Sequence, residues 1–192
     1  MDKEMLERVM LGIALVIASA LLWVVFSIAT QNLLGWAQYS RGIDLLYLPA
    51  GVRLLIVLVF GIWGATGIAI SNPFMALFVF GPNAQPETFT NSFIAGFVPY
   101  LTVVAGCKLL GVDRDLAALR PIHLAVLALA VSIVTPLAFN LQFMFDGLKP
   151  LEDLAANLSA MMLGDFLGCL LMLVLARLAI AIYRQAKVTF PQ

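Results

Sequence analysis

Two charged residues lie where a protein chain rarely places a charge. Arg53 is embedded in the apolar stretch LPAGVRLLIVLVFG, and Asp165 in the stretch LSAMMLGDFLGCLLMLVLARL. Stretches of this kind form membrane-spanning helices, where a charge costs at least about 2.5 kcal/mol. Such residues usually face the interior of a helix bundle and mark functional sites. We therefore predict that Arg53 holds an anionic ligand or that Asp165 takes up a proton or a cation.

A direct ion pair between these residues is the structural alternative. Arg53 lies about six residues inside the outer end of its span and Asp165 about eleven, which places them about 7–8 Å apart in depth. An arginine side chain bridges much of that difference. Such a pair would fix the register of two helices but would stabilise them little, because desolvation offsets the attraction.

Several amide side chains fall in the same outer half of the predicted spans. An unpartnered amide in lipid costs several kcal/mol, so such groups are expected to gather around a shared polar cavity. Asn91, Asn140 and Asn157 are the possible ligand contacts. The alternative is that those near span ends simply meet water. Asn72 precedes Pro73, where its side chain can satisfy backbone groups that the proline leaves free.

The composition defines the elements that position these residues. The chain has 192 residues, of which 62% are hydrophobic and 11% charged, and its mean hydropathy is +1.02. A soluble domain has roughly 25% charged residues. The sequence therefore predicts an all-α fold, a polytopic integral membrane helical bundle that forms a single transmembrane domain over residues 1–192. The net charge of zero offers no binding surface for nucleic acid.

About six transmembrane helices are predicted. The stretch 47–80 is too long for one span, and its Gly61 to Gly64 step suggests two short helices joined by a tight turn. Residues 31–46 form an outer loop that contains Asp44. Trp36 and Tyr39 in this loop, and Tyr47 directly after it, are placed to anchor at the outer interface. The predicted spans are about 9–30, 47–62, 64–80, 91–110, 121–143 and 154–183.

The basic residues orient these spans. Lysine and arginine accumulate in cytoplasmic loops of membrane proteins. They precede the first span, lie between the fourth and fifth spans and follow the sixth, whereas residues 81–90 contain none. Six spans with both termini in the cytoplasm place every basic cluster on the cytoplasmic side. The predicted location is the bacterial inner membrane, as a multi-pass protein.

Small residues spaced four apart predict close helix packing. Gly164 and Gly168 form such a pair in the last span, and Ala14 and Ala18 form one in the first. We expect packing within the bundle, or alternatively a docking surface for another membrane protein. Gly61 and Gly64 line the proposed turn of the 47–80 stretch.

Signatures of catalysis and metal binding are missing from the sequence. It has no CxxC, HExxH, Walker, GxSxG or GxGxxG motif, and no ligand set can be built around His123, its one histidine. We therefore predict no catalytic residue, no metal site and no cofactor, and expect a protein that is not an enzyme.

Three segments, taken in order, resemble a known family. LPAGVRLLIVLVFGIWGATGIAISN, NSFIAGFVPYLTVVAGCKLLG and the Gly164-Asp165-x-x-Gly168 step resemble the bacterial membrane-associated sensor domain of the MASE type, over about residues 47–178. The resemblance implies a helical sensory or anchoring module, which in that family usually precedes a kinase, cyclase or phosphodiesterase domain. This chain is shorter than the usual eight-span domain, and no effector domain is expected after its last predicted span. The expectation is therefore a stand-alone form that acts through a partner protein.

Three functions remain open at this point. The first is a sensory or anchoring module that binds a small ligand in its outer half and acts through a membrane or cytoplasmic signalling protein. The second is a substrate-binding S component of an energy-coupling-factor type transporter, whose size, span number and cytoplasmic termini also fit. There, Ala14 and Ala18 resemble the face that docks the coupling subunit. The third is a membrane assembly or scaffold protein without a ligand, with the lipid bilayer as its surroundings in every case.

Overall fold

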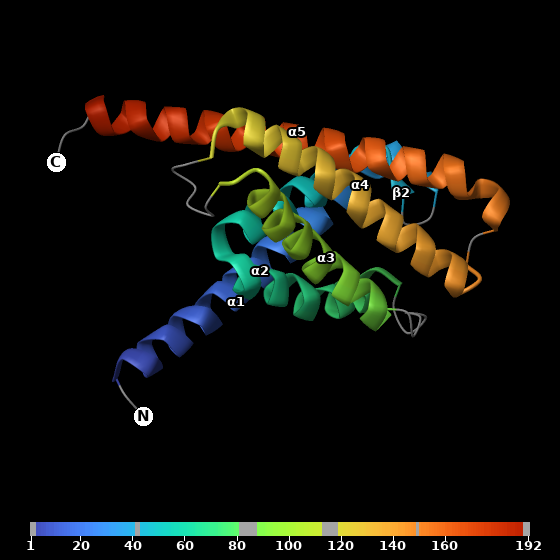
Figure 1. Cartoon of the computed structure of the whole chain (residues 1–192), viewed down its shortest axis with the longest axis horizontal. Helices are drawn as coiled ribbons and strands as arrows, with labels where there is room; N and C mark the ends of the chain where they lie inside the picture. Colours follow the sequence, from blue (N-terminus) through green and yellow to red (C-terminus); the bar gives the residue numbers. More distant parts are fainter. Residues whose placement is uncertain (1–2, 41–42, 81–87, 113–118, 149, 190–192) are drawn as a thin grey trace.

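Five long helices make up the structure (Figure 1). The computed structural model describes residues 3–40, 43–80, 88–112, 119–148 and 150–189. In these residues, five helices are long and apolar enough to cross a membrane. The predicted all-α, multi-pass membrane architecture is confirmed at this level. The helices are α1 (Lys3–Leu34), α2 (Leu48–Phe80), α3 (Thr88–Leu109), α4 (Pro121–Phe145) and α5 (Leu154–Thr189).

A short β-hairpin interrupts the helical pattern between α1 and α2. Strand β1 (Gln38–Ser40) pairs antiparallel with β2 (Ile43–Asp44), so that Gln38 lies opposite Asp44. The 3-10 turns η1 (Gly35–Ala37) and η3 (Leu151–Asp153) precede the hairpin and α5. The predicted outer loop is therefore shorter and more structured than expected, because α1 continues to Leu34.

Two helices extend beyond the predicted spans. Helix α1 begins at Lys3 rather than near residue 9, because the charged and apolar residues that precede the span are good helix formers. Helix α5 continues to Thr189, and none of its residues from 174 to 186 is buried. This end of α5 projects past the neighbouring helices in Figure 1.

Helix α2 is broken at Gly61. This glycine has φ 58° and ψ −131°, a backbone conformation that costs other residues strain. A methyl group added to Gly64 would lie 2.7 Å from the Ile56 side chain, although eight residues of straight helix would separate the two by about 12 Å. The segments 48–60 and 62–80 therefore meet at a sharp bend (Figure 1). The sequence predicted two short helices with a turn here, and the structure places the turn at Gly61 within one continuous helical assignment.

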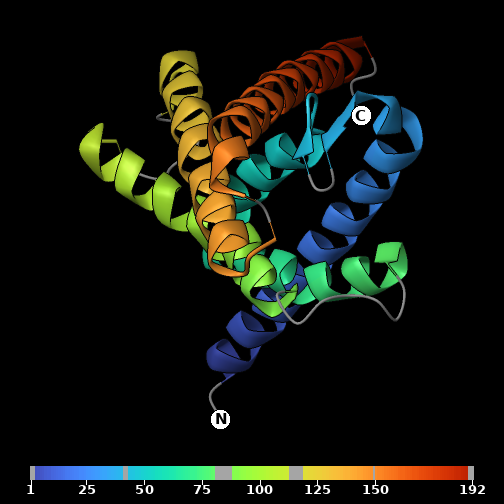
Figure 2. The ribbon, with the colours of Figure 1, turned by 90° about the vertical axis from the view of Figure 1, so that its right-hand side faces the viewer.

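The first segment of α2 forms the centre of the molecule. Helix α2 packs against α1, α3 and α5 and also touches α4. Nearly every residue from 49 to 57 is buried, which fits a helix that is apolar on all sides. The large apolar side chains on the outer faces of the other helices are exposed, as a lipid-facing surface requires. Figure 2 shows that these outer helices splay around α2 rather than run parallel.

The ends of the helices define two sides of the bundle. The start of α1 and the end of α5 lie on the left in Figure 1, whereas the β-hairpin and the end of α4 lie on the right. We call the right-hand side the hairpin side. The site described below is built from the helix halves nearest to it.

Candidate ligand-binding site

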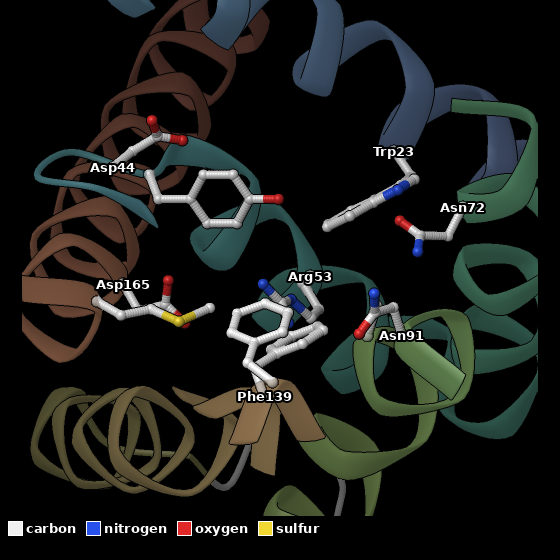
Figure 3. A pocket seen from close by; sticks show the side chains of 11 residues that line it. Trp23, Asp44, Arg53, Asn72, Asn91, Phe139 and Asp165 are labelled. Carbon is white, nitrogen blue, oxygen red and sulfur yellow. The ribbon is translucent and has the colours of Figure 1, made fainter. Parts of the chain in front are cut away.

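A cavity of about 170 Å³ lies on the hairpin side of the bundle (Figure 3). All five helices and the hairpin segment contribute to it. It is lined by Trp23, Asp44, Tyr47, Arg53, Asn72, Asn91, Ala95, Phe139, Phe143, Met161 and Asp165. The two charged residues that the sequence singled out thus line one cavity, together with Asn91.

Arg53 reaches the cavity from the central segment of α2. Its side chain is only 1% exposed, and its guanidinium carbon lies 5.3 Å from the centre of the Trp23 ring and 5.9 Å from that of Tyr47. Aromatic faces attract a cation at these distances. Its Nε and Nη1 atoms are nevertheless buried without a hydrogen-bond partner. The aromatic rings stabilise the charge but leave the N–H groups of these two nitrogens unused.

Asp165 reaches the cavity from α5. It is also 1% exposed, and neither of its carboxylate oxygens has a hydrogen-bond partner. The carboxylate therefore accepts no hydrogen bond from Arg53. The direct, hydrogen-bonded ion pair that the depth estimate suggested is not formed, because Arg53 is drawn toward the rings of Trp23 and Tyr47.

Other polar atoms around the cavity are also unpaired. The indole Nε1 of Trp23 and the amide Oδ1 of Asn91 are buried without a partner. Asn72 donates a hydrogen bond from Nδ2 to the Ser92 hydroxyl, 3.3 Å away, so it bonds to α3 rather than to the backbone near Pro73. Buried polar groups are nearly always hydrogen-bonded, so several buried polar atoms without a partner around one cavity require an explanation.

Asp44 adds a second carboxylate from strand β2, outside the helices. It is partly buried, and this burial raises the pKa of Asp44 above its usual value. The cavity thus combines one guanidinium with two carboxyl groups.

Two of the predicted ligand contacts do not line the cavity. Asn140 is buried on α4, where its Nδ2 donates to the Pro136 carbonyl oxygen at 2.9 Å and approaches the Met161 sulfur at 3.6 Å. Asn157 is buried on α5, just over two helical turns before Asp165. Asn140 and Asn157 were predicted at a depth similar to that of Asn91, but neither lines the cavity.

The small residues of α5 hold the chain segment that carries Asp44 and Tyr47. A methyl group added to Gly164 would overlap the Asp44 carbonyl oxygen, and one added to Gly168 would overlap that of Tyr47. The Tyr47 N–H donates to the Gly164 carbonyl oxygen at 3.1 Å. A methyl group on Gly51 would in turn overlap the Gly168 carbonyl oxygen. The Pro-Ala-Gly and Gly-Asp-x-x-Gly steps of the sequence are therefore in direct contact.

The small residues of α1 are arranged differently. Ala14 is exposed and Ala18 only partly buried. The buried face of α1 instead includes Gly12, against Trp63, and Ser19, against Gly67. The Ala14–Ala18 stripe therefore lies largely outside the packing of this chain.

Several residues of the cavity were not predicted from the sequence. Trp23, Phe139, Phe143 and Met161 look like ordinary apolar residues of a span, and no signal marks them. Tyr47 was expected at the membrane interface, but its ring lies beside Arg53. Asp44, an acidic residue close to the start of a span, was the one detectable signal.

Comparison with known proteins gives no match. No protein-family model fits the chain, and no curated protein and no solved structure is significantly similar to it. Within the described part of the chain, no group of three or more histidine, cysteine, aspartate or glutamate residues could hold a metal ion. The site must therefore be interpreted from its own residues.

Proposed function

We propose that this protein is a membrane-embedded receptor subunit, which binds one small polar molecule in the cavity and acts through a partner protein. The observation that carries the proposal is the set of orphaned polar atoms around the cavity. Arg53, Asp165, Trp23 and Asn91 each contribute at least one buried atom without a partner. A bound ligand would satisfy these atoms at once, whereas leaving each one unpaired costs about 1–3 kcal/mol.

The cavity sets the size of that molecule. Its volume of about 170 Å³ is close to that of the roughly 150 Å³ engineered cavity that holds benzene. We infer a ligand of about six to ten non-hydrogen atoms, a small metabolite rather than a lipid or a peptide.

We further propose six spans, with both termini in the cytoplasm of a bacterial cell and the cavity in the outer half of the inner membrane. The bend at Gly61 supports two crossings of the membrane by α2. The start of α1 and the end of α5 lie on the same side of the bundle in Figure 1, which supports an even number of spans. The basic residues near both ends favour the cytoplasmic side for them.

Native mass spectrometry of the protein released from its membranes in mild detergent tests the proposal. We expect a bound small molecule on the wild-type protein and its loss from Arg53→Gln and Asp165→Asn. Asn157→Ala is the matched control, because it removes a buried polar side chain of α5 that does not line the cavity.

Size-exclusion profiles check that each variant is folded. A wild-type protein without any bound molecule, or variants that keep it, would contradict the proposal. Variants that only lower the amount of protein while the folded fraction keeps the same bound molecules as the wild type would favour the scaffold hypothesis instead.

The partner distinguishes two modes of action. The resemblance to the sensor domain favours signalling, with a kinase or cyclase as partner. Transport is the second candidate, because the Ala14–Ala18 stripe of α1 lies largely outside the packing of this chain and offers small residues to a coupling subunit. Affinity purification from native membranes separates the two, since an S component would bring its coupling subunit and ATPases with it.

A further inference from the structure

The cavity has two chemically different regions. Figure 3 shows Asp44 and Asp165 to one side of Arg53, and Asn72, Asn91 and Trp23 to the other. Both unpaired oxygens of Asp165 are acceptors, whereas the unpaired nitrogens of Arg53 and Trp23 are donors. The negatively charged acceptors of Asp165 and the donors of Arg53 and Trp23, of which only the guanidinium is charged, therefore line the same small volume without bonding to one another.

A ligand with a single charge would satisfy only one of these regions. A simple anion held by Arg53 would leave the Asp165 carboxylate buried without a partner, and a simple cation beside Asp165 would leave the guanidinium without one. An uncompensated charge in a buried site is strongly unfavourable. Solvent cannot replace the missing partner well, because the cavity is also walled by Phe139, Phe143 and Met161.

We infer that the ligand is a small zwitterion. This inference rests on the proposed function and names its substrate class. The ammonium group of the ligand faces Asp165 and Asp44, and its carboxylate accepts hydrogen bonds from Arg53 and Trp23. With the size limit of the cavity, the class is that of free amino acids and short amino-carboxylates.

Matched sets of compounds test the charge requirement. Each set contains an amino acid, its deaminated acid and its decarboxylated amine, for example 4-aminobutanoate and leucine with their two derivatives. Replacing Trp36 and Trp63 by Phe leaves Trp23 as the one tryptophan of the chain, and its fluorescence reports binding in the cavity. We expect at least one amino acid to bind at least about tenfold more tightly than both of its derivatives, because each derivative loses a charged hydrogen bond.

Two variants assign the ends of the ligand. Asp165→Asn should abolish the preference for the amino acid over its acid, and Arg53→Gln its preference over the amine. Asn157→Ala should leave both ratios unchanged, since this residue does not line the cavity.

The outcomes separate this inference from the proposed function. Acids or amines that bind as tightly as the amino acids would overturn the zwitterion inference and leave a ligand-binding protein. The same holds if no compound binds but native mass spectrometry finds another bound molecule. If no compound binds and no bound molecule is found, both the inference and the proposed function fail.

Discussion

Arg53 is held in place by aromatic rings rather than by a carboxylate. An arginine keeps its charge in proteins, so the bundle must accommodate a cation in its most buried helix. The faces of Trp23 and Tyr47 provide part of this stabilisation, at 5.3 and 5.9 Å from the guanidinium carbon. Cation–π contacts do not use the N–H groups, so these remain available to a ligand.

Asp44 should make the stability of the protein depend on pH. Burial raises the pKa of Asp44 in the folded protein above its ordinary value of 3.8. At a pH above the raised pKa, the partly buried carboxylate is ionised and lowers the free energy of unfolding. This loss of stability disappears as the pH falls through the raised pKa toward 3.8, because the carboxyl group becomes protonated. Asp44→Asn should therefore raise the melting temperature in detergent at pH 7.5, because the amide carries no charge to desolvate. The gain should shrink on acidification and vanish near pH 4.

Asp153→Asn is the control for this measurement, because it makes the same substitution at an exposed position away from the cavity. Its melting temperature should follow that of the wild-type protein across the same pH range. A gain for Asp44→Asn that stays constant with pH would show that the burial of the charge is not its cause.

Some residues of the site could be found from the sequence for a simple reason. Arg53 and Asp165 contrast with the apolar residues around them, and a charge in a span is rarely without function. Phe139 and Trp23 have no such contrast, because the same residue types also face lipid. Whether an asparagine such as Asn140 faces the cavity depends on helix rotation, which depth alone cannot give.

At the scale of elements, α5 packs through Gly164 and Gly168 against the non-helical 44–47 segment. Gly164 is about 15 Å along α5, so the non-helical 44–47 segment packs against the body of this helix rather than against its end. Within a membrane, such backbone is tolerated only where protein covers it and its polar groups are bonded. Leu45 donates to the Ala37 carbonyl oxygen at 2.9 Å and Tyr47 to that of Gly164 at 3.1 Å.

Gly168→Ala should disrupt this packing. The added methyl group would overlap the Tyr47 carbonyl oxygen, and overpacking of this kind costs about 1–3 kcal/mol. We expect a lower melting temperature and weaker ligand binding, because Asp44 and Tyr47 both line the cavity. Heating followed by fluorescence-detected size exclusion measures the first effect.

Gly35→Ala provides the comparison, since a methyl group added there meets nothing within 4 Å. Equal melting temperatures for the two variants would contradict the close contact between α5 and the 44–47 segment. The GxxxG spacing predicted a close approach on this face, but not that an extended segment rather than another helix would fill it.

The break in α2 shows what a glycine pattern can predict. The Gly61 to Gly64 step, in a stretch too long for one span, correctly indicated a turn. The angle between the two segments follows from the packing of Gly64 against Ile56 and of Gly67 against Ser19. The contact between Gly67 and Ser19 joins two helices and residues distant in the sequence, so a local pattern could not give the geometry.

At the scale of the whole molecule, the proposed topology predicts which ends are accessible from which side. In a background without Cys107 and Cys169, we expect Lys3→Cys and Arg184→Cys to react with a membrane-impermeant maleimide only after the cells are permeabilised. Tyr39→Cys and Asp146→Cys should react on intact cells. All four positions are exposed in the structure.

Reaction of Lys3→Cys and Arg184→Cys from opposite sides would mean that α2 crosses the membrane once, and would contradict the six-span topology. Trp63→Cys supplies an internal check. Trp63 is partly exposed, two residues after the bend, and should behave like the two ends of the chain.

The distance in sequence between the two charged walls of the cavity has a consequence for biosynthesis. Arg53 is made more than one hundred residues before Asp165, so α2 enters the membrane while α5 does not yet exist. During that interval the guanidinium has only the rings of Trp23 and Tyr47, and the 44–47 segment lacks the glycines of α5 against which it packs. A nascent chain interrupted before α5 thus exposes unpaired backbone and an uncompensated charge within the bundle, and chains in such unfinished states are removed by the proteases of the cell.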